Sequence, residues 1–194
     1  VSHACDITQE DEIADDEAAI KATGAPSLVI VATGILSDGD ALQPEKTYRH
    51  QSMDAFERIF RINTFGPGLV AKHMLPIMPR NDRAVFAALS ARVGSISDNR
   101  LGGWHAYRAS KAALNMLIRN YAIEQGRRND EFIAAALHPG TVDTGLSEPF
   151  QSGVPEAQLF TPDVAAGHLL SVIDGLTPEM SGGAYDWAGK AIPA

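Results

Sequence analysis

Along this chain, uninterrupted apolar runs alternate with segments in which apolar residues recur at the spacing of a helix. Three of the runs are rich in small or β-branched apolar residues and lack polar alternation, which is typical of strands buried on both faces. They span residues 27–33 (SLVIVAT), 84–89 (AVFAAL) and 132–137 (FIAAAL), and residues 185–188 are a candidate last strand. We therefore expect a sheet with both faces covered.

Between these runs, apolar residues recur at the three- and four-residue spacing of a helix. Ser52 is a good N-cap for a helix over residues 52–75, which Pro67 should kink. The other expected helices span residues 13–23, 106–125 and 161–176. Strands separated by helices predict βαβ units and a doubly wound α/β fold with a mainly parallel sheet.

The composition and charge of the chain indicate one domain and argue against several classes of function. The 194 residues, 45% of them hydrophobic and 21% charged, suit one α/β domain over residues 1–194. A net charge of -8 without a basic run argues against a nucleic-acid partner, and no apolar run is long enough to span a membrane. A single cysteine, Cys5, fits a reducing cytoplasm, and the six scattered His predict no metal site.

The candidate chemistry centres on Tyr107 and Lys111, which share one helix face because four residues make about one turn. A cation about 4 Å from the phenol, at an effective dielectric constant of about 20, contributes about 4 kcal/mol. That is enough to lower the pKa of a tyrosine by roughly 2–3 units. The pair predicts an acid/base couple that acts on a carbonyl or hydroxyl oxygen.

Other polar segments follow the predicted strands, where the cleft of an open α/β sheet lies. Residues 139–144 (PGTVDT) follow one strand, and Ser90 and Ser95 follow another. Asn63 lies among apolar neighbours inside a predicted helix, where asparagine is unfavourable unless it has a polar role. Taken alone, residues 139–144 are more simply an ordinary turn after a strand.

Together these motifs resemble the short-chain dehydrogenase/reductase family. The resemblance is carried by Tyr107-x-x-x-Lys111, Asn63, Pro139-Gly140-x-x-x-Thr144 and the Ser/Gly-rich turn before Tyr107. Residues 94–115 and 189–193 further resemble its C-factor/sniffer-like carbonyl reductase branch. The match covers almost the whole chain, in order and at the family spacing.

The resemblance implies a Rossmann-like fold and hydride transfer between NAD or NADP and a small carbonyl compound or secondary alcohol. Tyr107 would be the general acid or base, Lys111 would lower its pKa and hold the ribose, and Asn63 would hold a relay water. The implied cofactor-binding residues are Asp6, Ile7, Ala32, Thr33, Gly34, Tyr107, Lys111, Pro139, Gly140, Val142 and Thr144. The two long helices would form a homodimer or homotetramer interface.

The sequence also departs from the family. The family's first strand, Gly-rich turn, first helix and second strand have no counterpart in this sequence, so we expect an N-terminally incomplete fold. The cofactor implied by the remaining motifs is NAD or NADP. Ala91 stands where the family has its catalytic serine, and Ser90 or Ser95 is expected to replace it. These departures leave open a catalytically silent relative with an interaction or signalling role and, more remotely, a nucleotide-binding module.

Two further segments border the expected cleft. Residues 145–160 mix Gly, Pro and apolar side chains, and a long loop at a cleft is often a lid. Trp104 and His105 precede Tyr107 and either line a substrate pocket or pack at the start of the helix.

Overall fold

A five-stranded sheet forms the centre of the computed structural model, which describes residues 2–194. Its strands, in spatial order, are β1 (Leu28–Val31), β2 (Ala84–Leu89), β3 (Phe132–His138), β6 (Ala184–Asp186) and β7 (Ala191–Ile192). The first four are parallel and β7 is antiparallel, so the sheet is mixed. A separate parallel pair joins β4 (Thr141–Val142) to β5 (Leu159–Phe160). This architecture confirms the predicted α/β fold class.

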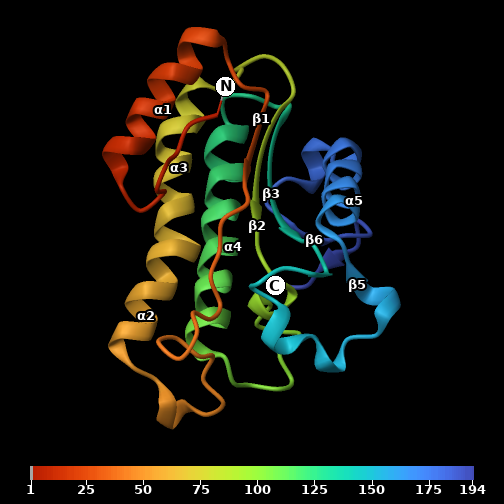
Figure 1. Ribbon diagram of the computed structural model, residues 1–194. Coiled ribbons are helices and arrows are strands. Elements are labelled where there is room, and N and C mark those ends of the chain that lie inside the picture. The colour runs from red at the N-terminus through yellow and green to blue at the C-terminus, as the bar shows by residue number, and fades with distance from the viewer. Residues whose placement is uncertain (1) are drawn as a thin grey trace.

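Helices cover the two faces of the sheet unequally. One side carries α1 (Glu10–Thr23), α2 (Met53–Phe60), α3 (Gly66–Met74) and α4 (His105–Gly126), and the other carries α5 (Pro162–Gly175) (Figure 1). Alternate strand residues face opposite layers: Phe86 packs with Leu114 of α4, and Val85 with Ile173 of α5. The chain moves across the sheet in one direction, from β1 to β2, β3 and β6. The first two connections pass over the face that carries α2, α3 and α4, and the third passes over the opposite face through α5. The third connection therefore has the opposite hand to the first two.

Two of the expected helix starts are confirmed by their caps. The Ser52 hydroxyl accepts a hydrogen bond from the Ala55 N–H at 3.2 Å, and the Thr161 hydroxyl accepts one from the Val164 N–H at 3.4 Å.

The prediction that Pro67 kinks the helix is wrong, both in the position of the interruption and in its type. The helix is interrupted earlier by a π-helical turn, Arg61–Phe65, which separates α2 from α3. Pro67 lies in the first turn of α3, where its missing N–H and fixed φ are tolerated.

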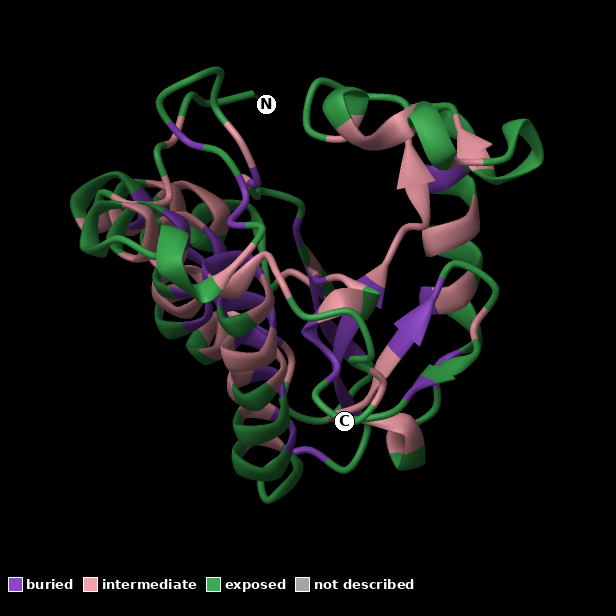
Figure 2. Ribbon diagram, turned by 90° about the horizontal axis from the view of Figure 1, so that it is seen from below, coloured by how far each residue is buried: buried purple, intermediate pink, exposed green. Residues whose placement is uncertain are grey.

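The expected burial of both faces is wrong for β1. Val31 belongs to the core under α4, whereas Leu28 and Ile30 are each 40% exposed on the opposite face. β1 is the edge strand of the described sheet, and α5 packs on residues of β2 and β3. Figure 2 shows the buried residues concentrated in the strands and on the inner side of the long helices.

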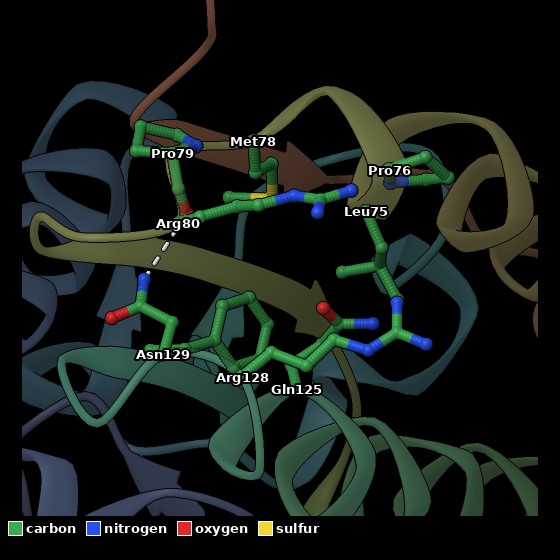
Figure 3. A pocket seen from close by; sticks show the side chains of 9 residues that line it. Leu75, Pro76, Met78, Pro79, Arg80, Gln125, Arg128 and Asn129 are labelled. Atoms are coloured by element: carbon green, nitrogen blue, oxygen red, sulfur yellow. Dashed lines mark hydrogen bonds between the residues drawn. The ribbon is translucent and has the colours of Figure 1, made fainter.

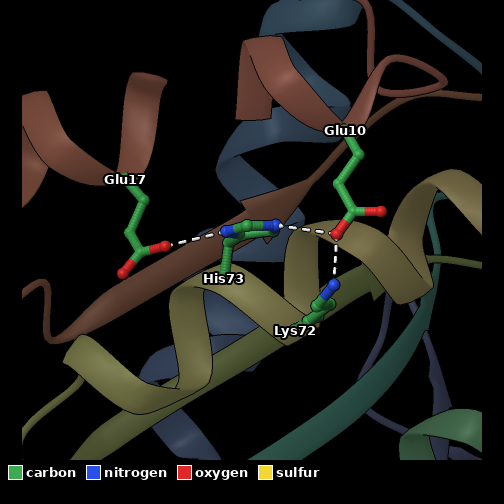
Figure 4. Close-up of polar contacts among 4 residues, drawn as sticks. All are labelled: Glu10, Glu17, Lys72 and His73. Carbon is green, nitrogen blue, oxygen red and sulfur yellow. Dashed lines mark hydrogen bonds and ion pairs between the residues drawn. The ribbon is translucent and has the colours of Figure 1, made fainter. Parts of the chain in front are cut away.

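Polar contacts and one buried side chain hold α1 against α3. The His73 Nδ1 lies 2.7 Å from a Glu17 carboxylate oxygen, and its Nε2 lies 3.4 Å from Glu10, which also pairs with Lys72 (Figure 4). Such partly exposed pairs contribute about 1 kcal/mol or less each. Ile13, which is 1% exposed, supplies the buried apolar surface of α1.

Candidate active site

Three loops meet where the parallel strands end. Val31 lies opposite Ala88, and Leu89 lies opposite Leu137, so the segments that follow β1, β2 and β3 share one edge of the sheet. The Ser90 N–H donates to the Leu137 carbonyl at 2.8 Å and ties two of these segments together. This is the edge at which open α/β sheets bind their ligands.

Asn63 joins the loop after β1 to both long helices. It is fully buried in the π-helical turn. Its Oδ1 accepts from the Ile35 N–H at 2.8 Å, and its Nδ2 donates to the Ile35 carbonyl at 2.9 Å and to the Ser110 hydroxyl at 3.2 Å. These bonds explain how an asparagine is accommodated among apolar neighbours, and π turns are frequent at functional sites.

Tyr107 and Lys111 lie together on α4, as their spacing predicted. The Lys111 Nζ is 5.8 Å from the centroid of the Tyr107 ring and donates to the Leu89 carbonyl at 2.7 Å. Gly34 lies against the same group, since a Cβ added there would be 3.5 Å from both Lys111 Nζ and Asn63 Oδ1. The structure thus brings together four of the residues that the sequence singled out, including Asn63.

Burial sets the protonation of this pair. It raises the pKa of Tyr107 to about 12 and lowers the pKa of Lys111 to about 8. The expectation that the ammonium lowers the pKa of the phenol is therefore wrong in direction, because desolvation of two almost fully buried groups outweighs their attraction. At neutral pH Tyr107 keeps its proton, which is the form that donates to a carbonyl oxygen.

The serines beside Ala91 are bonded within the fold. The Ser90 hydroxyl donates to Asn115 Oδ1 at 2.7 Å, and the Ser95 hydroxyl accepts from the Asp98 N–H at 3.1 Å. Ser90 therefore faces α4, and Ser95 stabilises its own loop. Sequence reasoning missed Asn115, although its spacing of four residues from Lys111 places it on the same helix face.

The turn after β3 is held by aromatic side chains. Gly140 has a φ of 79°, and a Cβ added there would be 2.8 Å from the Phe160 ring and 3.0 Å from Trp187. The Val142 carbonyl accepts from the Thr144 hydroxyl at 3.4 Å. Pro139 and Gly140 thus lead into a turn of partly exposed residues that follows β3.

The remaining implied cofactor residues lie on loops at the edge of this region. Asp6 is exposed, and hydrogen bonds from the Thr8 backbone and hydroxyl lower its pKa. Ile7 packs on Gly66, where an added Cβ would be 2.5 Å from Ile7 Cδ1. Ala32 and Thr33 are exposed directly after β1.

Trp104 connects the helix of Tyr107 to the long loop. Its ring centroid is 6.3 Å from that of Tyr107 and 5.0 Å from that of Phe150, which belongs to residues 145–160. The pairing of β4 with β5 closes the base of this loop. Trp104 therefore contacts both elements that border the candidate site.

A small cavity of about 50 Å³ lies elsewhere, beside the start of β3 (Figure 3). The Asn129 side chain crosses one end of it and donates to the Pro79 carbonyl at 3.1 Å. Its lining residues are Leu75, Pro76, Met78, Pro79, Arg80, Gln125, Arg128, Asn129 and Phe132. Phe132 begins β3, so this cavity is at the end of the sheet opposite Tyr107 and Lys111.

Comparison with known proteins agrees with this geometry. The family profile described as Enoyl-(Acyl carrier protein) reductase matches residues 1–171. C-signal of Myxococcus xanthus is 41% identical over 136 residues, which are 70% of this chain and 76% of that protein. This chain belongs to the short-chain dehydrogenase/reductase family. Its sequence and neighbours place it with the C-factor/sniffer-like members.

A second short-chain dehydrogenase relative is 1-hydroxy-2-glutathionyl-2-methyl-3-butene dehydrogenase of Rhodococcus sp. (strain AD45). It is 39% identical over 129 residues, 66% of this chain and 54% of that enzyme. The chain thus spans between about half and three quarters of these relatives.

Solved structures of short-chain dehydrogenases show the same fold. The NADPH-bound carbonyl reductase from chicken fatty liver has a TM-score of 0.82 at 26% identity, over 98% of this chain and 75% of that one. Carbonyl reductase Sniffer of D. melanogaster has a TM-score of 0.83 at 21% identity, over 99% and 77%. Across residues 2–194, no helix is both long and apolar enough to cross a membrane.

Proposed function

We propose that this member of an oxidoreductase family reduces a small carbonyl compound with NADH or NADPH, and that Tyr107 supplies the proton. The observation that carries the proposal is the placement of Lys111. Lys111 is only 3% exposed, and its amine lies beside the Tyr107 ring and donates to the carbonyl at the end of β2. A buried lysine is costly, and perturbed groups of this kind cluster at functional sites.

The residues present fit the nicotinamide half of such a cofactor. Gly34 leaves room beside the Lys111 amine, which still has donors for ribose hydroxyls. The turn at Gly140 and Val142 offers backbone groups for an amide, and Thr144 adds a hydroxyl. For the pyrophosphate half, the 194 residues contain no Gly-rich turn between a strand and a helix. Asp6 and Ile7 are proposed to lie near the adenine.

NADH or NADPH held by these residues would supply the hydride for the carbonyl carbon. Tyr107 donates its phenolic proton to the carbonyl oxygen, which completes the alcohol. The Lys111 amine, with a pKa of about 8, returns a proton to the phenolate, and Asn63 is proposed to hold the water that relays a proton back to Lys111. Ser90 or Ser95 is proposed to polarise the carbonyl in place of a serine at Ala91; for Ser90 this requires its hydroxyl to turn away from Asn115 Oδ1.

The Tyr107→Phe variant tests the proposal. Turnover of NADPH with a panel of aldehydes and ketones should be lost, while NADPH affinity, measured by isothermal titration, should stay within about twofold. Tyr121→Phe is the matched control, because Tyr121 lies on the same helix and packs its ring on Phe86. Unchanged turnover in Tyr107→Phe refutes the proton role.

A catalytically silent relative with an interaction or signalling role is the second candidate function. Ala91 at the family's serine position favours it, as does the 41% identity to a protein named C-signal. Titration with both nucleotides separates the two. A chain that binds neither NADPH nor NADH, and that turns over no carbonyl compound, supports the silent role.

We also propose that the chain pairs with itself through its long helices, in a cytoplasmic setting that suits the single Cys5. Phe65, Met116 and Ile123 are 58%, 61% and 43% exposed along this side of the molecule. Exposed apolar side chains on neighbouring helices are typical of subunit interfaces. Sedimentation equilibrium should find a dimer or tetramer, and a monomer at micromolar concentration would refute this part.

A further inference from the structure

Glu45 is a buried carboxylate beside the start of the helix that carries Tyr107. Only 3% of its surface is exposed, although it lies in the loop between β1 and α2, 61 residues before Ala106. Its carboxylate oxygens accept from the Ala106 N–H at 3.3 and 3.4 Å, and its backbone carbonyl accepts from the Trp104 N–H at 2.6 Å. One distant residue therefore holds two of the residues that begin α4.

The backbone that enters α4 needs such support. Gly102, Gly103 and Trp104 have consecutive φ values of 64°, 67° and 50°, all in the left-handed region. For a tryptophan this conformation is sterically unfavourable, and it persists only where surrounding contacts impose it. The bond from Trp104 to the Glu45 carbonyl is one such contact.

The helix start also lacks a local acceptor. Trp104 occupies the N-cap position, where an indole cannot accept a hydrogen bond because it has only a donor. The first turn of α4 contains no acidic residue. The Glu45 carboxylate supplies both the acceptor and the negative charge that a helix N-terminus favours.

We propose that Glu45 is a positioning residue for Tyr107, which sets the start and direction of α4 so that the phenol reaches the substrate carbonyl. This inference rests on the proposed function, because that function gives Tyr107 the proton transfer. Tyr107 follows Ala106 directly, so a shift of the Ala106 backbone moves the phenol with it. A misplacement of about 1 Å in a reacting group can cost about 100-fold in rate.

The test compares Glu45→Ala, Glu45→Gln and a control, Ser52→Ala, in the full chain. Ser52→Ala removes a helix cap of the same kind from α2, where Ser52 accepts from the Ala55 N–H at 3.2 Å. Three measurements are made: amide exchange at Ala106, the ¹³C NMR titration of the Tyr107 ring, and steady-state kinetics (kcat and KM) for a simple aldehyde with NADPH.

Glu45→Ala should speed Ala106 amide exchange at least about tenfold. It should also lower the pKa of Tyr107 from about 12 toward its ordinary 10.0, because a frayed first turn admits water. We expect kcat to fall about 10- to 100-fold, with KM changed less than about threefold. Glu45→Gln keeps an acceptor oxygen, so its exchange rate, Tyr107 pKa and kinetic constants should lie close to those of the unsubstituted chain. Ser52→Ala should leave all of these values unchanged.

The inference is overturned if Glu45→Ala leaves the Ala106 exchange and the Tyr107 titration as they are. It is also overturned if Ser52→Ala changes them equally, because a general loss of stability would then account for the effect. Failure of the proposed function gives a separate result, because the unsubstituted chain would then show no turnover. The amide exchange at Ala106 and the titration of Tyr107 would still report whether Glu45 holds the start of α4.

Discussion

Asn63 and Ile35 are bonded in both directions, although they are 28 residues apart. The asparagine Oδ1 accepts from the Ile35 N–H at 2.8 Å, and its Nδ2 donates to the Ile35 carbonyl at 2.9 Å. The side-chain amide thus pairs with one backbone residue as a neighbouring strand would. It fixes the loop after β1 beside Lys111, so the helices and the sheet edge keep one relative position at the candidate site.

Asn63→Ala should lower both stability and turnover. It leaves the partly buried N–H and carbonyl of Ile35 without their side-chain partner, which costs on the order of 2 kcal/mol in the free energy of unfolding. Denaturant unfolding and NADPH turnover measure the two effects. Asn120→Ala, at an exposed position of α4, is the control and should change neither. An Asn63→Ala variant as stable as the unsubstituted chain would contradict this reading of the bonds.

Lys111→Met should remove a pH dependence of stability. The pKa of Lys111 is about 8 when folded and 10.5 when exposed, so between these values the unfolded chain binds more protons. The free energy of unfolding therefore rises with pH across this window, by on the order of 3 kcal/mol. Above about pH 10 the raised pKa of Tyr107 reverses the slope.

Denaturant unfolding between pH 7 and pH 10 measures this slope. Lys111→Met should lose this rise and should lose turnover, while Lys21→Met on exposed α1 should keep the rise. A rise that persists in Lys111→Met would show that another group causes it.

Ala91→Ser should raise turnover if a serine at this position polarises the carbonyl. One well-placed donor to a developing oxyanion is worth roughly 100-fold or more, and we expect a gain of about tenfold because the neighbouring serines already contribute. Ser90→Ala and Ser95→Ala locate the present donor. If Ala91→Ser gains nothing while one of these two loses turnover, that serine has taken over the role.

Phe150→Ala should open the loop at residues 145–160. The Phe150 ring packs on Trp104 at 5.0 Å between centroids, and its removal should speed limited proteolysis within the loop and raise KM more than it lowers kcat. Glu156→Ala lies in the same loop and serves as the control. In the unsubstituted chain, cofactor with substrate should slow the cleavage, and an unaffected cleavage rate would argue against a lid.

The local pattern of residues along the chain was enough to predict many of the helices and strands. The unbroken apolar runs predicted β2 and β3 almost to the residue, and Ser52 and Thr161 marked the starts of α2 and α5. Four-residue spacing placed Tyr107 and Lys111 on one helix face. These features depend on neighbours along the chain, so the sequence expresses them directly.

Contacts between distant segments decided the rest. Asn63, in the π-helical turn, is bonded to Ile35 and Ser110, and Glu45 reaches Ala106 from 61 residues away. Burial in the assembled fold reversed the expected direction for the pKa of Tyr107, since desolvation depends on what surrounds a side chain. The sequence by itself determined the elements, the order of the polar segments and the spacing of Tyr107 and Lys111. Only the tertiary structure decided which groups meet and how far water is excluded from them, because both depend on segments that are remote in the chain.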